Sequence, residues 1–279
     1  MQEFQYFRPK TINEALELLD KYGRDIKVLA GGTDLIVALR DNVVVCKYIM
    51  DIKAIKELQQ ISHSESEGLS IGAAVCLNDI IHSETVKNGY PLLIEAAKTL
   101  ANSLLRNRAT LVGNICTASP GGDMLSPSIV LDGRVEIASK RETRTLALRE
   151  FFLGVKQTAL KEDELVTRIV FPAIKGQGKY MKKSRIKGHD LAQVGVAAFI
   201  RENGGLKLSI SAVGPTPIIV EGFEDCARVD LQTKKQAIIQ KVLREIKPIN
   251  DQRASKDYRT AMVEYLTGEI LAELGGEVS

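Results

Sequence analysis

Apolar residues along the first forty positions change from a helical spacing to a short continuous run. They recur every three or four positions over residues 12–22, which predicts a helix, and Thr11 begins a capping box at its start. The unbroken apolar run at residues 26–30 predicts a buried strand, and residues 35–40 predict a short helix. Two glycines lie between them, so the order here is strand, glycine turn, helix.

The middle of the chain combines short apolar runs with one long amphipathic stretch. An apolar stripe through Leu93, Ala96 and Leu100 predicts that residues 90–105 form the clearest helix of this half. Residues 106–132 follow and are rich in glycine, serine, asparagine and proline, which predicts a long functional loop. Strands are predicted at residues 48–52, 69–73, 134–139, 144–148 and 165–171, with a short helical turn from residue 151.

Proline and glycine gather at residues 172–178, where we expect a boundary between domains. Beyond it, an Asn-Gly-Gly sequence at residues 203–205 separates two apolar runs and is typical of a β-hairpin. The strands of that hairpin are predicted at residues 194–201 and 206–213, and helices at about 232–246 and 254–274. The sequence thus predicts an α+β protein with domains at residues 1–174 (subdomains about 1–55 and 56–174) and 175–279.

Composition and charge exclude several classes of protein. The 279 residues are 44% hydrophobic and 26% charged, which is typical of a globular chain that buries a core. The net charge of +3 is too balanced for a protein that binds nucleic acid by neutralising phosphates. No apolar run approaches the ~18 residues of a membrane span. Because the N-terminus also lacks the pattern of a secretory signal, we expect a cytoplasmic protein.

The cysteines and histidines do not form a metal-binding pattern. Cys46, Cys76, Cys116 and Cys226 each stand alone, without a second ligand at metal-binding spacing. They are interpreted as small buried side chains, and only three histidines are present. We therefore expect no metal site on this chain, and no residue is assigned a catalytic role.

Two polar loops carry the candidate chemistry. Gly31 and Gly32 follow the first buried strand and let the backbone bring its N–H groups close to an anion such as a diphosphate. The second loop, residues 108–123, collects threonine, asparagine, serine and aspartate side chains that suit hydroxyl and phosphate groups. Neither the Rossmann nor the P-loop pattern is matched. From these residues alone, an ordinary glycine turn and a loop that satisfies its own backbone remain open.

A third segment, residues 182–192, begins with a run of basic residues. Such a run is usually a solvated surface. Because it comes just before a predicted apolar strand, it leaves room for one lysine to point inward.

Taken together, these segments resemble the FAD-binding medium subunit of the molybdenum hydroxylases, the group of xanthine, carbon monoxide and nicotinate dehydrogenases. The resemblance covers nearly the whole chain. Its motifs are residues 7–9 (FRP), 30–35 (AGGTDL), 106–115 (RNRATLVGNI), 119–123 (SPGGD), 151–154 (FFLG), 164–172 (ELVTRIVFP), 190–192 (DLA) and 214–217 (GPTP). Each motif is modest alone, and their common order makes the resemblance specific.

The resemblance implies the two-subdomain FAD-binding fold of the vanillyl-alcohol-oxidase (PCMH) type, followed by a small α+β domain like that of CO dehydrogenase flavoproteins. It implies that residues 28–35 wrap the FAD diphosphate and that Asp123 bonds the ribityl or diphosphate region. It places Leu100 and Val166 along the flavin and Lys182 near the isoalloxazine ring. The implied cofactor-binding residues are Val28, Leu29, Ala30, Gly31, Gly32, Thr33, Asp34, Leu35, Leu100, Thr110, Gly113, Asn114, Asp123, Val166 and Lys182.

Two places depart from the family's pattern. Val112 stands where the family commonly has the first of two glycines, and we expect that this position does not need a left-handed backbone. Gly188 and His189 stand where many members have acidic or polar residues.

The function that the resemblance implies is electron transfer. Electrons from a molybdopterin-containing large subunit cross two [2Fe–2S] clusters on a small subunit, reach FAD on this chain, and pass to NAD or another acceptor. Two alternatives are a free-standing flavin-dependent oxidase or dehydrogenase and a cofactor-free scaffold subunit. Residues 173–279 are few for the substrate domain of a full-size oxidase, and the intact glycines argue against a scaffold.

Overall fold

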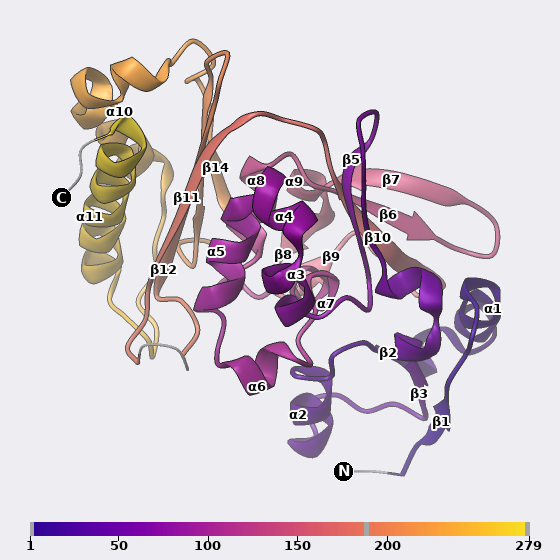
Figure 1. Cartoon of the computed structure of the whole chain (residues 1–279). Coiled ribbons are helices and arrows are strands. Elements are labelled where there is room, and N and C mark those ends of the chain that lie inside the picture. Colours follow the sequence, from indigo (N-terminus) through magenta and orange to yellow (C-terminus); the bar gives the residue numbers. More distant parts are fainter. Residues whose placement is uncertain (1–2, 187–189, 277–279) are drawn as a thin grey trace.

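The computed structural model describes residues 3–186 and 190–276, so Gly188 and His189 lie outside the described residues (Figure 1). The N-terminal part is a parallel sheet in the order β1–β3–β2. Its elements are β1 (Gln5–Phe7), α1 (Ile12–Tyr22), β2 (Ile26–Leu29), α2 (Leu35–Arg40) and β3 (Tyr48–Asp51). The Thr11 hydroxyl accepts the N–H of Glu14 and Gly23 ends α1, as the pattern predicted. The Glu14 carboxylate, however, accepts the N–H of Lys10, one residue before the expected partner.

A second, antiparallel sheet has the strand order β4–β5–β10–β6–β7. Its strands are β4 (Ile61–Ser64), β5 (Gly68–Gly72), β6 (Arg134–Ala138), β7 (Thr143–Ala147) and β10 (Leu165–Phe171). The helices between β5 and β6 are α3 (Leu77–His82), α4 (Glu84–Gly89), α5 (Pro91–Thr99), α6 (Ser103–Arg106), α7 (Leu111–Thr117) and α8 (Leu125–Val130). After β7 come α9 (Leu148–Phe151) and the small ladder β8 (Phe152–Gly154) with β9 (Gln157–Thr158). The run of helices lies between this sheet and the C-terminal sheet (Figure 1).

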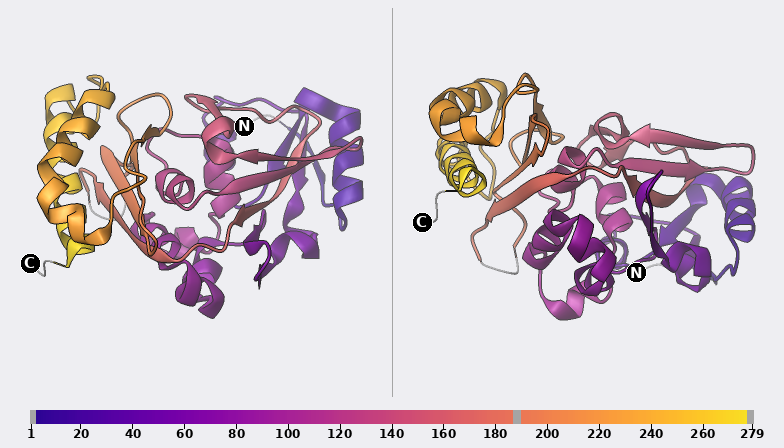
Figure 2. Two further views of the ribbon diagram at one scale, coloured as in Figure 1. Left: turned by 90° about the horizontal axis from the view of Figure 1, so that it is seen from above. Right: turned by 45° about the horizontal axis from the view of Figure 1, so that its top comes forward.

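The C-terminal part is a four-stranded antiparallel sheet in sequence order, backed by two helices on its outer face (Figure 2). Its elements are β11 (Gly176–Lys183), β12 (Val194–Arg201), β13 (Leu206–Ser211), β14 (Ile218–Val220), α10 (Leu231–Glu245) and α11 (Lys256–Gly275). The expected hairpin is confirmed, with Gly204 and Gly205 at positive φ in its turn.

Strand β12 packs into two apolar cores and so joins the C-terminal sheet to the rest of the chain. Ala197 and Phe199 point into the large core shared by the two N-terminal sheets and their helices. Val196, Ala198 and Ile200 point the other way, into a second core under α10 and α11. Because successive side chains alternate between faces, a strand buried on both sides needs an unbroken apolar run, and this is what the sequence has.

The predicted helix at residues 90–105 is wrong in its second half. The chain leaves the helix after Thr99, Ala101 takes a left-handed φ of 46°, and α6 restarts at Ser103 with Asn102 as its N-cap. Leu100 packs against the core and also lines a cavity, whereas Leu104 and Leu105 of α6 are exposed. The apolar periodicity therefore reported burial correctly only up to the break.

The long loop expected at residues 106–132 is also only partly a loop. It contains α7 and α8, whose Gly113 and Pro127 do not break them. Val112 lies inside α7, so its backbone is helical, as expected for a β-branched side chain. The remaining turn at residues 118–124 is stabilised by the N–H of Gly122, which donates to the carbonyl of Ser119. The short helical turn expected from residue 151 is wrong in position, because α9 ends at Phe151 and strand β8 follows it.

Candidate cofactor site

A cavity of about 580 Å³ opens where the three parts of the chain meet. Its wall combines the turn between β2 and α2, the corner between α5 and α6, helix α7, the start of β10 and short segments of the C-terminal part. The lining residues outside the predicted set are Ile52, Ala73, Ala101, Leu105, Ala109, Val112, Cys116, Thr117, Ser119, Lys156, Leu160, Glu164, Leu165, Asp190, Leu191 and Arg253. A volume of this size suits a bound small molecule.

The turn between β2 and α2 lies directly against the segment that leads into α7. A Cβ on Gly31 would come within 2.0 Å of the carbonyl oxygen of Arg108, so only glycine permits this approach. Gly32 has a positive φ of 79°, a backbone conformation that glycine adopts easily because it has no Cβ. Within the part of the chain that the structure describes, no hydrogen bond uses the backbone N–H groups of residues 31–35. Five adjacent donors of cavity-lining residues are therefore available to a ligand.

The backbone just after β2 is held by a charged side chain from the 3-10 turn that follows β3. Lys53 Nζ donates to the carbonyl oxygen of Ala30 at 3.0 Å and lies 2.8 Å from Asp51 Oδ1. Burial tends to raise the pKa of Asp51, but hydrogen bonds from Lys53 and Tyr6 outweigh it and lower that pKa. The ionised Asp51 thus fixes Lys53 beside the turn.

Helix α7 is stabilised by its own polar side chains. The Thr110 hydroxyl accepts the N–H of Gly113 at 2.9 Å and caps the helix. Asn114 Oδ1 accepts the N–H of Met124 at 3.2 Å, which ties the helix to the far end of the second polar loop. The side chains that were predicted to bind a ligand therefore also stabilise the loop. This agrees with the alternative that the polar side chains of the loop satisfy its own backbone.

Asp123 forms a buried ion pair with Lys182. Lys182 Nζ lies 2.9 Å from Asp123 Oδ2, and the Tyr180 hydroxyl donates to Asp123 Oδ1 at 3.2 Å. Burial raises the pKa of the Asp123 carboxyl, whereas Lys182 and Tyr180 act in the opposite direction. Lys182 also donates to the carbonyl oxygen of Thr99 at 3.4 Å. One lysine of the basic segment does point inward, and its partner is a carboxylate.

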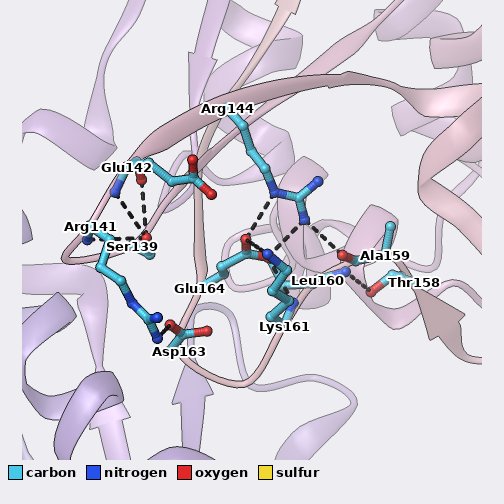
Figure 3. A network of polar contacts seen from close by, with 10 residues as sticks. All are labelled: Ser139, Arg141, Glu142, Arg144, Thr158, Ala159, Leu160, Lys161, Asp163 and Glu164. Carbon is cyan, nitrogen blue, oxygen red and sulfur yellow. Dashed lines mark hydrogen bonds and ion pairs between the residues drawn. The ribbon is translucent and has the colours of Figure 1, made fainter.

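A second charged network contains Glu164, which also lines the cavity (Figure 3). Arg144 binds Glu164 with two parallel hydrogen bonds, Nε to Oε1 at 2.9 Å and Nη2 to Oε2 at 2.8 Å. The same guanidinium donates to the carbonyl of Ala159, and the N–H of Lys161 donates to Glu164. These contacts order the segment that carries Leu160 into the cavity wall.

The structure brings almost all of the predicted residues together. Those that line the cavity are Val28, Ala30, Gly31, Gly32, Thr33, Asp34, Leu35, Leu100, Thr110, Gly113, Asn114, Asp123 and Val166. Leu29 instead packs against a small core with Leu39 and Ile49, because alternate residues of β2 face opposite sides. Lys182 reaches the site only through Asp123.

Several lining residues were missed by sequence reasoning. Glu164, Asp190 and Leu191 stand in motifs of the family resemblance, so a signal for them was present. Lys156 and Arg253 come from turns outside the helices and strands, and no local pattern distinguishes them. Burial raises the pKa of the Cys116 thiol to about 12, so this lining cysteine offers no nucleophile.

The described residues contain neither a metal-binding group nor a membrane-spanning helix. Among residues 3–186 and 190–276, no three histidine, cysteine, aspartate or glutamate side chains are grouped to hold a metal ion. In the same residues, no helix is long and apolar enough to cross a membrane.

Comparison with known proteins identifies the family of the chain. The family model described as "FAD binding domain in molybdopterin dehydrogenase" matches residues 2–174, and "CO dehydrogenase flavoprotein C-terminal domain" matches residues 179–274. The carbon monoxide dehydrogenase medium chain of Hydrogenophaga pseudoflava is 34% identical over 93% of this chain and 92% of its own length. The xanthine dehydrogenase FAD-binding subunit of Escherichia coli O157:H7 is 30% identical over 96% and 94%.

Solved structures agree with these matches. A carbon monoxide dehydrogenase chain from Hydrogenophaga pseudoflava, in an enzyme that lacks the Mo-pyranopterin moiety, superposes with a TM-score of 0.91 and 30% identity. The match covers 100% of this chain and 99% of that one. The fold and the matches define the chain as a FAD-binding subunit of an oxidoreductase. It belongs to the molybdenum hydroxylase family, among the medium subunits of carbon monoxide and xanthine dehydrogenase type. The expected fold class and cofactor are thereby confirmed.

Proposed function

We propose that the cavity described above holds FAD and that the chain relays electrons. These electrons would start at a molybdopterin-containing large subunit and reach this chain through [2Fe–2S] clusters on a small partner subunit. From FAD they would pass to NAD or another acceptor. FAD, when bound, supplies one-electron and hydride chemistry that no amino-acid side chain offers. The task of this chain is then to bind the cofactor, orient it and exclude water from it.

The observation that carries the proposal is the set of unused N–H groups at residues 31–35. A diphosphate is doubly charged and accepts several hydrogen bonds, and adjacent backbone donors after a glycine turn bind such groups well. The close contact between Gly31 and Arg108 brings a second polar segment to the same place. These two features support the diphosphate end of the cofactor as the group bound at this turn.

The remaining predicted residues divide by chemistry. Thr110, Asn114 and Asp123 place polar groups along the cavity and suit the ribityl hydroxyls, whereas Leu100 and Val166 suit an apolar ring. Lys182 is not among the described lining residues, and its ammonium is held by Asp123. We therefore propose that Lys182 does not contact the flavin and acts on it electrostatically, as one member of the ion pair with Asp123.

Two further parts of the proposal concern organisation. The division into residues 1–174, with subdomains of about 1–55 and 56–174, and 175–279 is supported by the three larger sheets, which lie within residues 5–51, 61–171 and 176–220. A second apolar core within residues 181–274 also supports the last boundary, although Tyr180, Ala197 and Phe199 pack into the first core. The partner subunits are supported by the names of the relatives, since a medium chain is one chain of an assembly. The cytoplasmic location remains a prediction from the sequence.

The test is to purify this chain alone and together with its partner chains. Alone, it should bind one equivalent of FAD, seen as visible flavin absorbance, and should not oxidise carbon monoxide, aldehydes or heterocycles. In the assembly, a reducing substrate should bleach the flavin, and NAD or another acceptor should restore its colour. Substrate turnover by the single chain would favour the free-standing oxidase, and failure to bind FAD would favour the scaffold.

A further inference from the structure

The corner between α5 and α6 is a strained part of the cavity wall. Ala101 has a left-handed φ of 46°, which alanine rarely adopts because its Cβ crowds the backbone. Leu100 and Ala101 nevertheless line the cavity, as does Leu105 of the following helix. A conformation of this kind persists only where surrounding contacts determine it.

Those contacts come from one arginine. Arg106 Nη1 donates to the carbonyl oxygens of Leu100 at 2.9 Å and Ala101 at 3.2 Å, and it lies 3.4 Å from that of Lys98. Three carbonyls thus converge on one nitrogen of the guanidinium. Hydrogen bonds with a charged donor are stronger than neutral ones, so this contact can hold the turn closed.

Arg106 is itself oriented by a buried amide. Its Nε donates to Asn78 Oδ1 at 3.3 Å, and Asn78 is 7% exposed. Asn78 Nδ2 donates in turn to the carbonyl of Ser103 at 2.9 Å and to Asn107 Oδ1 at 2.6 Å. Helix α3, which carries Asn78, therefore fixes both the corner and the start of the segment that contacts Gly31.

We infer that Arg106 is a positioning residue for the cofactor. Arg106 is not among the described residues that line the cavity. It acts by holding Leu100 and Ala101 in the wall and by fixing the segment that ends at Arg108, whose carbonyl lies against Gly31. The inference rests on the proposal that FAD occupies this cavity.

The experiment compares Arg106→Ala with Arg228→Ala. Arg228 also donates to a backbone carbonyl, that of Leu274 at 2.7 Å, but in the C-terminal helical pair away from the cavity. Apoprotein of each variant is titrated with FAD and melted without FAD. Arg106→Ala should weaken FAD binding by roughly tenfold or more, where each tenfold corresponds to ~1.4 kcal/mol of binding free energy. Arg228→Ala should lower only the melting temperature. Arg106→Lys, which keeps the charge but loses the fork, should fall between Arg106→Ala and the unchanged protein.

A second-site change distinguishes positioning from general damage. Ala101→Gly removes the steric cost of the left-handed turn, so the turn then depends less on Arg106. Added to Arg106→Ala, it should recover a large part of the affinity for FAD that Arg106→Ala loses. Should Arg106→Ala not fold, Arg106→Lys with and without Ala101→Gly gives the same comparison.

Unchanged FAD affinity in the Arg106 variants, or a loss that Ala101→Gly does not relieve, overturns the inference. The proposed function fails separately, if the unchanged protein does not bind FAD or if Gly31→Ala binds FAD as the unchanged protein does.

Discussion

Lys182 Nζ lies 2.9 Å from Asp123 Oδ2, and both side chains are almost fully buried, with 6% and 4% exposed. The pair joins strand β11 of the C-terminal sheet to the polar loop of the cofactor cavity. Asp123 was predicted to bond the ribityl or diphosphate region of FAD, and in the structure Lys182 and Tyr180 each bind one of its carboxylate oxygens. The carboxylate can still accept further bonds from a ligand, because each of its oxygens has two acceptor sites.

Asp123→Ala should therefore affect both stability and binding. Removal of the carboxylate leaves the Lys182 ammonium buried without a counter-charge, which costs about 3–5 kcal/mol in buried pairs of this kind. The free energy of unfolding of the apoprotein, measured by urea denaturation, should fall accordingly. The double variant Asp123→Leu/Lys182→Met should recover much of this loss, since it leaves no unpaired charge. An apoprotein as stable as the unchanged one would show that Lys182 finds another partner.

The same variant tests the flavin contact. If Asp123 also accepts FAD hydroxyls, the double variant, whose stability is restored, should still bind FAD roughly tenfold to a hundredfold more weakly, at 1.4 kcal/mol per tenfold. Fluorescence titration of the apoprotein measures this directly. Equal affinity in the double variant would leave Asp123 with a structural role alone.

Gly31→Ala should abolish FAD binding with little change elsewhere. A Cβ at this position would lie 2.0 Å from the Arg108 carbonyl oxygen, so the two polar segments must separate. Gly89→Ala is the matched control, because a Cβ there meets no atom within 4 Å. We expect the control to bind FAD like the unchanged protein in an equilibrium titration. Strong FAD binding by Gly31→Ala would contradict the proposed diphosphate site.

Gly195→Ala should destabilise the protein around Tyr180, the residue that binds Asp123. A Cβ on Gly195 would lie 2.7 Å from the Tyr180 hydroxyl and 2.4 Å from Ser211 Oγ, in a place without free space. Overpacking of this kind costs about 1–3 kcal/mol. Urea denaturation should show that loss, and a Tyr180→Phe background should reduce it by removing the crowded oxygen. An equal loss in both backgrounds would point to Ser211 instead.

Glu164 should make the stability of the protein fall in acid. Burial alone would raise its pKa, but the hydrogen bonds from Arg144 and the Lys161 N–H outweigh burial and lower that pKa below its usual value. The unfolded chain then binds the proton more readily, so stability is full above the unfolded pKa and is lost as pH falls through the folded pKa.

The measurement compares the unchanged protein with Glu164→Gln by urea denaturation across pH. Near neutral pH the variant should be less stable by about 1.5–3 kcal/mol, the usual value of hydrogen bonds to a charged group. The gap should close as pH falls below about 4, near the pKa of an unfolded glutamate. Glu162→Gln, on an exposed side chain nearby, is the control. A gap that stays constant with pH would show that folding does not shift the pKa of Glu164.

Much of the fold followed from local pattern. The bounds of α1, α2, β10 and β12 were predicted to the residue, because each element has its own periodicity and an evident start or stop. Most of the residues that the resemblance motifs supplied also line the cavity, since most of them stand in the two loops that follow these elements. These parts of the chain carry their structural information in adjacent residues.

Other elements left no such pattern. Strand β11 is rich in glycine and lysine, and β1, β4 and β14 lie at sheet edges. Such strands are stabilised by backbone hydrogen bonds to a neighbour, and no side-chain pattern reports a backbone partner. They were therefore missed, although the strands beside them were found.

The sequence by itself determined that a glycine turn follows a buried strand, that polar residues gather in a second loop, and that the chain has the motifs of one family. Only the tertiary structure decided where the helix at residues 90–105 breaks and which charge Lys182 meets. Both depend on groups distant in sequence. Asn78 and Arg106 hold Ala101 in a conformation its own residue type disfavours, and Asp123 lies fifty-nine positions before Lys182. Contacts of this kind exist only once the sheets have packed, because only then does burial make an unpaired charge or carbonyl costly.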